Sequence, residues 1–256
     1  MPFSQSLSQK RIVIIDGNSD TGLAVAKQAY TLGATVILAG TTESTLQTAT
    51  HKNSPPIESY TVDLTDNISV KTLFQQIRTL DYLVVTTPEP QFGHFLELDI
   101  EQVHQEFERK FWGQYRAVKE AVSVLTAAGS IVLVNGAYSA RPIAGATSLA
   151  AVQAGIEGLA RGLAIDLCPI RVNVISPGVT TNPTLYDAGD ADFQTLSSRP
   201  VNSPSPQSLC TPDDIAEWIL YLLSNPHMTG NTLFPDGGYT LGNATLITQP
   251  SLSQVC

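Results

Sequence analysis

The sequence predicts an α/β protein with one doubly wound domain over residues 1–256 and a mostly parallel seven-stranded sheet. The first observation is that short β-branched runs alternate along the chain with longer segments whose apolar residues recur every three or four positions. The second is the stretch 129–181, where the apolar run 131–134, a helical pattern over 148–167 and the run 171–175 follow one another. Such a strand–helix–strand crossover places its two strands parallel.

The first half of the chain opens with a strand at 11–15, a glycine-containing turn and a helix at 23–31. A turn of this kind lets the backbone approach a pyrophosphate at the N-terminus of a helix, which is a dinucleotide-binding arrangement. The alternative is that Gly17 and Gly22 only permit a tight turn. Asp20 adds a negative charge where a phosphate would lie. Further strands are predicted at 34–39, 59–62 and 81–85, with a helix at 67–79.

The second half predicts helices at 98–126, 148–167 and 211–224 and strands at 131–134, 171–175 and 232–234. Thr211 and Pro212 are typical of a helix N-cap and first turn. The expected strand order is 3-2-1-4-5-6-7. Small residues at 150–158 let two helices approach closely, so helices 98–126 and 148–167 are expected to pair with their copies in a homodimer or homotetramer.

The run EGLARGLAIDL–PIRVNVISPG at 157–178 closely resembles the short-chain dehydrogenase/reductase family, and Asp236-Gly237-Gly238-Tyr239 adds to the match. The resemblance implies a Rossmann-type fold. The catalytic Ser, Tyr and Lys of that family fall on Gly136, Leu149 and Gln153, so all three are absent. Lys110-Phe111-Trp112-Gly113 is similar to a divergent branch with an FWG signature, which includes enzymes of specialised metabolism.

The resemblance implies NADP or NAD as cofactor, although the degenerate phosphate turn leaves open that no dinucleotide binds. The residues that it places at the cofactor are Gly17, Ser19, Gly22, Thr41, Asp63, Leu64, Pro177, Gly178 and Val179. Asp63 has the alternative of an Asx turn or helix N-cap, the latter better served by Asp66 or Asn67. Lys110 occupies the position of a fourth catalytic residue, an Asn, and is expected to be a solvated or snorkelling lysine.

The remaining candidates for catalysis are Tyr138, for proton transfer, with Asn135 and Arg141 flanking it as possible oxyanion or carboxylate ligands. The alternative is that Tyr138 fills space vacated by the missing side chains. Gly136, Leu149, Gln153 and Tyr186 are the candidate substrate-binding residues. The polar, Pro-rich segment 179–210 is expected to be a substrate lid, and 240–256 a C-terminal arm.

Three functions remain open. The first is NAD(P)H-dependent reduction of an imine or activated alkene of a small, largely apolar metabolite, because an iminium needs little help from an acid. The second is a non-redox cyclase or isomerase that uses the cleft as a shaped pocket. The third is a non-catalytic binding protein.

The amino-acid composition limits the classes of partner that the protein is expected to bind. With 14 Lys and Arg against 23 Asp and Glu, the net charge is −9, which argues against nucleic acid and anionic membranes. No metal site is predicted, and a small-molecule substrate is expected. The scattered cysteines and the absence of an apolar span or a signal-like N-terminus favour a cytoplasmic protein.

Overall fold

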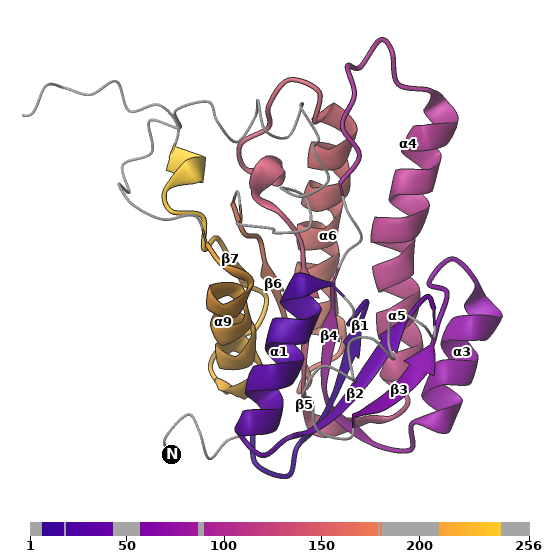
Figure 1. Ribbon diagram of the computed structural model, residues 1–256, viewed down its shortest axis with the longest axis vertical. Coiled ribbons are helices and arrows are strands. Elements are labelled where there is room, and N and C mark those ends of the chain that lie inside the picture. Colours follow the sequence, from indigo (N-terminus) through magenta and orange to yellow (C-terminus); the bar gives the residue numbers. More distant parts are fainter. Residues whose placement is uncertain are drawn as a thin grey trace, which may run out of the picture.

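The computed structural model describes residues 7–17, 19–42, 57–86, 90–178, 180 and 210–241. Its centre is a seven-stranded sheet in the order β3-β2-β1-β4-β5-β6-β7, in which every neighbouring pair is parallel (Figure 1). The predicted strand order is therefore confirmed. All strands end at one edge of the sheet, where ligands lie in open α/β folds.

The strands are β1 Arg11–Ile15, β2 Thr35–Gly40, β3 Glu58–Thr61, β4 Leu80–Val85, β5 Leu125–Val134, β6 Arg171–Ile175 and β7 Thr232–Leu233. The α-helices are α1 Asp20–Thr31, α3 Asn67–Gln76, α4 Ile100–Phe107, α5 Gly113–Ala121, α6 Thr147–Asp166 and α9 Pro212–Ser224. Three short turns of helix complete the elements of the described residues: η2 Glu108–Trp112, η3 Ala137–Ser139 and η4 Tyr239–Leu241.

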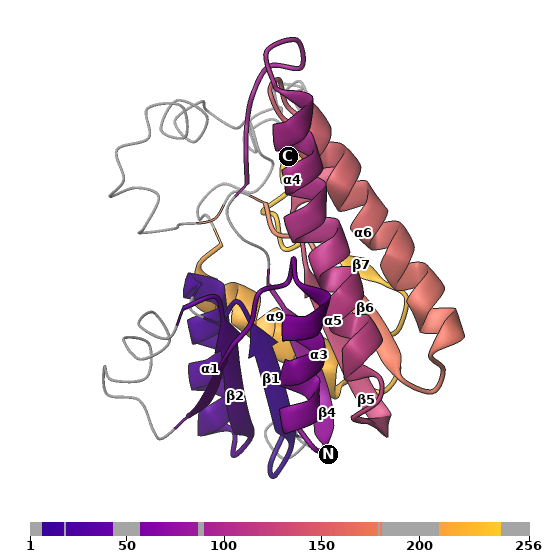
Figure 2. The same cartoon turned by 90° about the vertical axis from the view of Figure 1, so that its right-hand side faces the viewer.

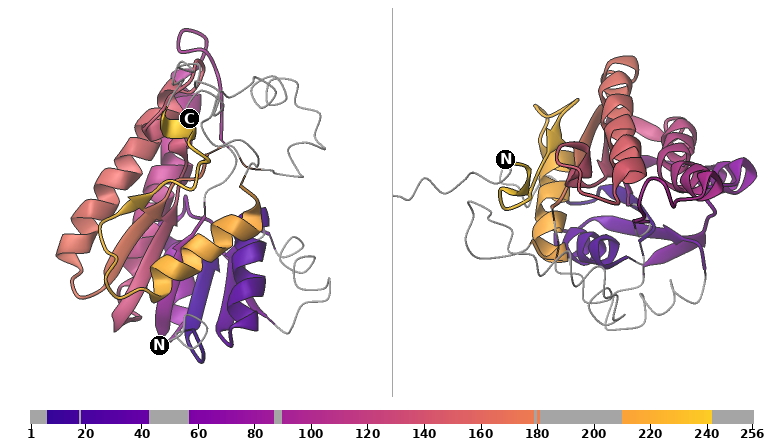
Figure 3. Two further views of the ribbon diagram at one scale, coloured as in Figure 1. Left: turned by 90° about the vertical axis from the view of Figure 1, so that its left-hand side faces the viewer. Right: turned by 90° about the horizontal axis from the view of Figure 1, so that it is seen from above.

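Two apolar cores lie on opposite faces of the sheet, because successive side chains of a strand point to opposite sides. In β1, Val13 and Ile15 face the core built with α3, α5 and α6, whereas Ile12 and Ile14 face the core built with α1 and α9. Seen from above, the sheet lies between these two groups of helices (Figure 3). This is the doubly wound arrangement that the sequence predicts.

The predicted helix 98–126 is wrong as a single helix. α4 ends at Phe107, a π-helical turn η2 follows, and α5 ends at Ala121, so that α4 and α5 continue one another beside α6 (Figure 2). Strand β5 then begins at Leu125, six residues before the predicted start. A π-turn inserts an extra residue into the helix, and the periodicity of apolar residues does not reveal such an insertion.

Helix boundaries follow from capping groups. α1 begins at Asp20, three residues before the predicted start, because the Ser19 hydroxyl accepts a hydrogen bond from the Gly22 amide. The predicted N-terminus of α9 is confirmed: Thr211 and Asp214 form a capping box, with Pro212 in the first turn. α3 ends at Gln76 rather than 79.

Two predicted segments fall largely outside the described residues. Of the lid 179–210, only Thr180 and Cys210 are described, and these two form a parallel β-bridge. Residues 242–256 of the predicted C-terminal arm also lie outside. In the described part of the chain, no helix is long and apolar enough to cross a membrane, and no cluster of His, Cys, Asp or Glu could hold a metal ion.

Candidate functional site

The turn between β1 and α1 is closely packed at both predicted glycines. A Cβ at Gly17 would lie 2.6 Å from Cδ2 of Leu38, and one at Gly22 would lie 2.8 Å from the Gly17 Cα. The turn therefore requires glycine at these positions whether or not a dinucleotide binds. Ser19 caps α1, and its hydroxyl also lies 3.3 Å from that of Thr86 at the end of β4.

Asp16, at the start of this turn, has a φ of 57°, a left-handed conformation that Asp and Asn tolerate better than most residues. Burial raises the pKa of its carboxyl, and the positive charge of Lys110 opposes that shift. Lys110 is 3% exposed, so the expectation of a solvated or snorkelling lysine is wrong. Its Nζ lies 3.6 Å from Oε1 of Glu106, which is equally buried.

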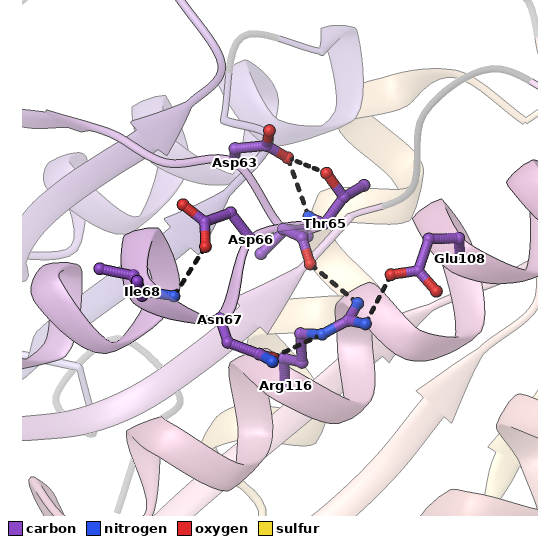
Figure 4. A network of polar contacts seen from close by, with 8 residues as sticks. Asp63, Thr65, Asp66, Asn67, Ile68, Glu108 and Arg116 are labelled. Carbon is purple, nitrogen blue, oxygen red and sulfur yellow. Dashed lines mark hydrogen bonds and ion pairs between the residues drawn. The ribbon is translucent and has the colours of Figure 1, made fainter.

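The turn after β3 carries Asp63 and Leu64, and Figure 4 shows the polar network around it. The Asp63 carboxylate accepts bonds from the Thr65 amide at 2.8 Å and from its hydroxyl at 2.7 Å, which is the Asx turn weighed as the alternative to an adenine contact. Asp66 caps α3 through the Ile68 amide at 2.9 Å, as expected. The Asp63 side chain is exposed, so this turn leaves one carboxylate oxygen accessible.

Arg116 of α5 fixes the same turn from the other side (Figure 4). Its guanidinium donates to the Leu64 carbonyl at 3.2 Å and to Asn67 at 2.8 Å, and it pairs with Glu108 of η2 at 2.5 Å. A Cβ at Gly113 would lie 3.1 Å from Cβ of Leu64, so the FWG glycine lets α5 approach this turn.

The positions that lack the family's catalytic residues lie close to one another near the end of β5. A Cβ at Gly136 would lie 2.6 Å from Nε2 of Gln153, which shows that the amide of Gln153 occupies the space beside Gly136. Gln153 Oε1 accepts from the Ser139 amide at 3.2 Å, and its backbone carbonyl accepts from Asn135 Nδ2 at 3.1 Å. Asn135, Gly136 and Gln153 therefore form one contact group, with Leu149 buried on the same helix, α6.

Tyr138 lies in an aromatic cluster with Phe92 and Tyr239. Its ring packs edge-on at 5.6 Å from Phe92 and 6.2 Å from Tyr239. Burial raises the pKa of Tyr138 to about 12, which makes its phenol a weaker acid than an exposed tyrosine. Arg141 stacks 4.8 Å over the Tyr239 ring and donates to the Tyr239 carbonyl at 2.6 Å, so this guanidinium binds the C-terminal DGGY turn.

The remaining predicted residues lie along the same edge of the sheet. Pro177 accepts a bond from the Ala137 amide at 3.0 Å, which joins the loop after β6 to the loop after β5. A Cβ at Gly178 would lie 3.0 Å from the Asp236 Cα. Thr41 is exposed after β2. Val179 and Tyr186 lie outside the described residues.

Sequence reasoning missed two couplings in this region. From the sequence, Gly136 and Gln153 are two separate replacements of catalytic residues, although in the structure they fit each other sterically. The available signal was their spacing, because Gly136 lies thirteen residues before Leu149 and Gln153 lies four residues after it. Nothing in the sequence indicates the hydrogen-bond network of Arg116, because an arginine in a helix resembles any surface cation.

Comparison with known proteins places these features in a family. The sequence model of the Enoyl-(Acyl carrier protein) reductase family matches residues 18–240. The short-chain dehydrogenase/reductase malC of Malbranchea aurantiaca is 29% identical, over 92% of this chain and 96% of that protein. The short-chain dehydrogenase/reductase ucsE of an Acremonium species is 28% identical, over 92% of this chain and 97% of that protein.

Two solved structures are also similar. The MalC Reductase/Diels-Alderase from Malbranchea aurantiaca has a TM-score of 0.84 and 28% identity, covering 93% of this chain and 99% of the other. A small-chain dehydrogenase in complex with NADPH has a TM-score of 0.75 and 29% identity, covering 92% of this chain and 100% of the other.

Proposed function

Because the chain belongs to the short-chain dehydrogenase/reductase family, we propose that it is an atypical oxidoreductase that reduces an imine or activated alkene of a small, largely apolar metabolite. The observation that carries the proposal is the fit of Gln153 against Gly136. This pair replaces the family's Lys and Ser, and Leu149 replaces its Tyr. A substrate that needs no strong protein acid suits such a site.

Gly17 and Gly22 let the end of β1 and the N-terminus of α1 approach closely, which is the kind of turn at which dinucleotides bind in α/β folds and which supports the proposal. We propose that NADPH or NADH lies along this turn, with its adenine end toward Thr41, Asp63 and Leu64 and its nicotinamide end toward Pro177 and Gly178. The similar dehydrogenase solved with NADPH supports this assignment. A bound reduced nicotinamide supplies the hydride.

The chain's own residues would orient the substrate rather than protonate it strongly. An iminium is already positive, so hydride addition leaves a neutral amine and needs no further proton. Hydride addition to an activated alkene leaves an enolate, which would take its proton from water. The Gln153 amide of α6 and the Asn135 side chain are two of the polar groups near the end of β5. Because burial raises the pKa of Tyr138 to about 12, we propose that its ring, together with Leu149, shapes the cleft.

A non-redox cyclisation is the second candidate, favoured by the aromatic cluster that Tyr138, in the turn after β5, forms with Phe92 and Tyr239. A rigid, apolar pocket accelerates an intramolecular reaction by holding the substrate in one conformation. The similar MalC protein is described as both a reductase and a Diels-Alderase, which supports considering both activities.

We also propose a homo-oligomer, with α4, α5 and α6 at the interface between copies. Trp112 and Tyr115 are 44% and 38% exposed on the surface of η2 and α5. Gly158 of α6 faces outward, where an added Cβ would meet only Arg161. Sedimentation at micromolar concentration tests this, and a monomer alone would contradict it.

Titration of the purified protein with NADPH and with NADH, followed by fluorescence, tests the redox assignment directly. We expect saturable binding of one of the two, followed by oxidation of the bound cofactor when cyclic imines or enones are added. Binding without turnover by any such substrate favours cyclisation. If neither dinucleotide binds, the reductase proposal is rejected, and a cyclase or a non-catalytic binding protein remains.

A further inference from the structure

We propose that the side-chain amide of Gln153 donates a hydrogen bond to a carbonyl oxygen of the substrate, so that the substrate is an alkene conjugated to a carbonyl group rather than an imine. This inference rests on the proposed function and narrows its substrate class. The amide nitrogen of Gln153 lies beside Gly136, just after β5, and donates no hydrogen bond to any residue that the structure describes.

The orientation of the Gln153 amide follows from its contact with Ser139. The Ser139 backbone N–H donates to Oε1 of Gln153 at 3.2 Å. Because a backbone N–H can only donate, the amide has to turn its oxygen toward Ser139. Its nitrogen, Nε2, points toward Gly136 instead and is the atom nearest to an added Cβ there, at 2.6 Å, whereas Oε1 lies at 3.4 Å.

Glu157 fixes Ser139 from the same helix. Its carboxylate accepts a hydrogen bond from the Ser139 hydroxyl, and Glu157 follows Gln153 by one turn of α6. The helix therefore holds Ser139 both by its backbone amide and by its hydroxyl. Gln153 is itself only 6% exposed, so its side chain has little room to turn. The N–H groups of Nε2 are thus held in one direction before any ligand binds.

Other donors near this strand end already have acceptors within the fold. Asn135 Nδ2 donates to the Gln153 backbone carbonyl at 3.1 Å and to the Ser176 hydroxyl at 3.4 Å, and Arg141 donates to the Tyr239 carbonyl at 2.6 Å. A polar group that is almost fully buried needs a partner. Gly136 is only half-buried, so this strand end is open on one side to an acceptor from outside the protein.

A carbonyl oxygen is the acceptor that suits both this donor and the proposed reduction. Hydride addition from a reduced nicotinamide, which is thereby oxidised, to the β-carbon of an enone shifts the π electrons onto the carbonyl oxygen. The resulting enolate takes a proton from water at its α-carbon. An N–H aimed at that oxygen binds the enolate more strongly than the neutral ketone, because hydrogen bonds to charged acceptors are stronger. An iminium nitrogen has no lone pair, so Gln153 gives it no such help.

Turnover of two probes tests the assignment: benzylideneacetone, which is an enone, and dihydroisoquinoline, which is a cyclic imine. Gln153→Met removes the N–H donor at similar volume. It should lower kcat/KM for the enone about a hundredfold, the order found for loss of one oxyanion donor, and change that for the imine by less than about threefold. Gln75→Met, at an exposed position of α3, is the matched control. Equal losses with both probes, an unchanged enone rate, or a wild type that reduces only the imine overturns the inference.

Nuclear magnetic resonance of the full chain gives a readout that needs no turnover. The side-chain amide resonance of Gln153, identified by its loss in Gln153→Met or Gln153→Glu, should move when benzylideneacetone is added. It should stay in place with propenylbenzene, which lacks the carbonyl group. A resonance that moves equally with both compounds, or with neither, overturns the inference even if the variants fold poorly. A wild type that binds no dinucleotide and reduces neither probe rejects the proposed function, and the titration then decides the role of Gln153 by itself.

Discussion

Restoring the family's serine at Gly136 should destabilise the protein, because Gln153 already occupies the space. A Cβ at this position would lie 2.6 Å from Nε2 of Gln153, well inside van der Waals contact. The flexible Gln153 side chain would have to move and give up its bond to the Ser139 amide. A lost hydrogen bond to a buried group costs about 1–3 kcal/mol, and overpacking costs a similar amount when the neighbour cannot move. We expect Gly136→Ser to lower the free energy of unfolding by about 2 kcal/mol.

The assay is urea unfolding of Gly136→Ser, Gln153→Ala and the double variant. Because Ala vacates the space that Ser needs, the double variant should be more stable than the sum of the two single effects by about 1–2 kcal/mol. Gly162→Ser is the control, since a Cβ there meets nothing within 4 Å. Strict additivity of the two changes would refute the steric coupling of Gly136 and Gln153.

Three further predictions concern the packing and hydrogen bonds of residues in and around the candidate site. Gly113→Ala should fail to gain the roughly 1 kcal/mol that Ala normally adds to a helix, because its Cβ would press on Leu64, whereas Gly162→Ala should gain it in the same urea assay. Arg171→Met should cost about 3 kcal/mol in that assay, since it removes bonds to the carbonyls of residues 222, 223 and 228 at the end of α9. The folded-state pKa of Tyr138, about 12, lies above the ordinary 10.0, so its contribution is complete below pH 10 and is lost as the pH rises toward 12. Wild-type stability should therefore fall more steeply over that interval than that of Tyr138→Phe, and equal slopes would contradict the burial of this phenol.

Most of the fold could be predicted because its determinants are local or periodic. Runs such as Arg11–Ile15 and Arg171–Ile175 are apolar enough to be buried strands, and the 148–167 pattern matches α6 within one residue at each end. The strand order follows from right-handed crossovers once the elements are known. The prediction of a single helix failed at η2, because a π-turn changes the helix register without changing its apolar composition.

The places of the candidate site residues along the chain could be predicted from the sequence. The contacts that their side chains make could not. The sequence placed Gly17 and Asp63 just after strands, where the structure finds them, and Gly22 in the β1–α1 turn, whereas the structure has it in the first turn of α1. It treated Lys110 as a solvated or snorkelling side chain, although its ammonium is buried beside Glu106. It also treated Arg141 as a possible oxyanion ligand, whereas its guanidinium stacks on Tyr239. Arg141 differs because its partner Tyr239 lies 98 residues away in the chain. Glu106 is only four residues from Lys110, but the burial of the two side chains depends on the segments that pack around them.

By itself, the sequence determined the doubly wound topology and the loss of the Ser, Tyr and Lys positions, since periodicity and motif spacing are properties of neighbouring residues. The tertiary structure alone decided that Gln153 fills the space beside Gly136 and that Arg116 donates to the Leu64 carbonyl. These pairs lie 17 and 52 residues apart in the chain. Their contacts exist only after the sheet and helices have packed, because close packing and the burial of charge depend on what the rest of the fold places around each side chain.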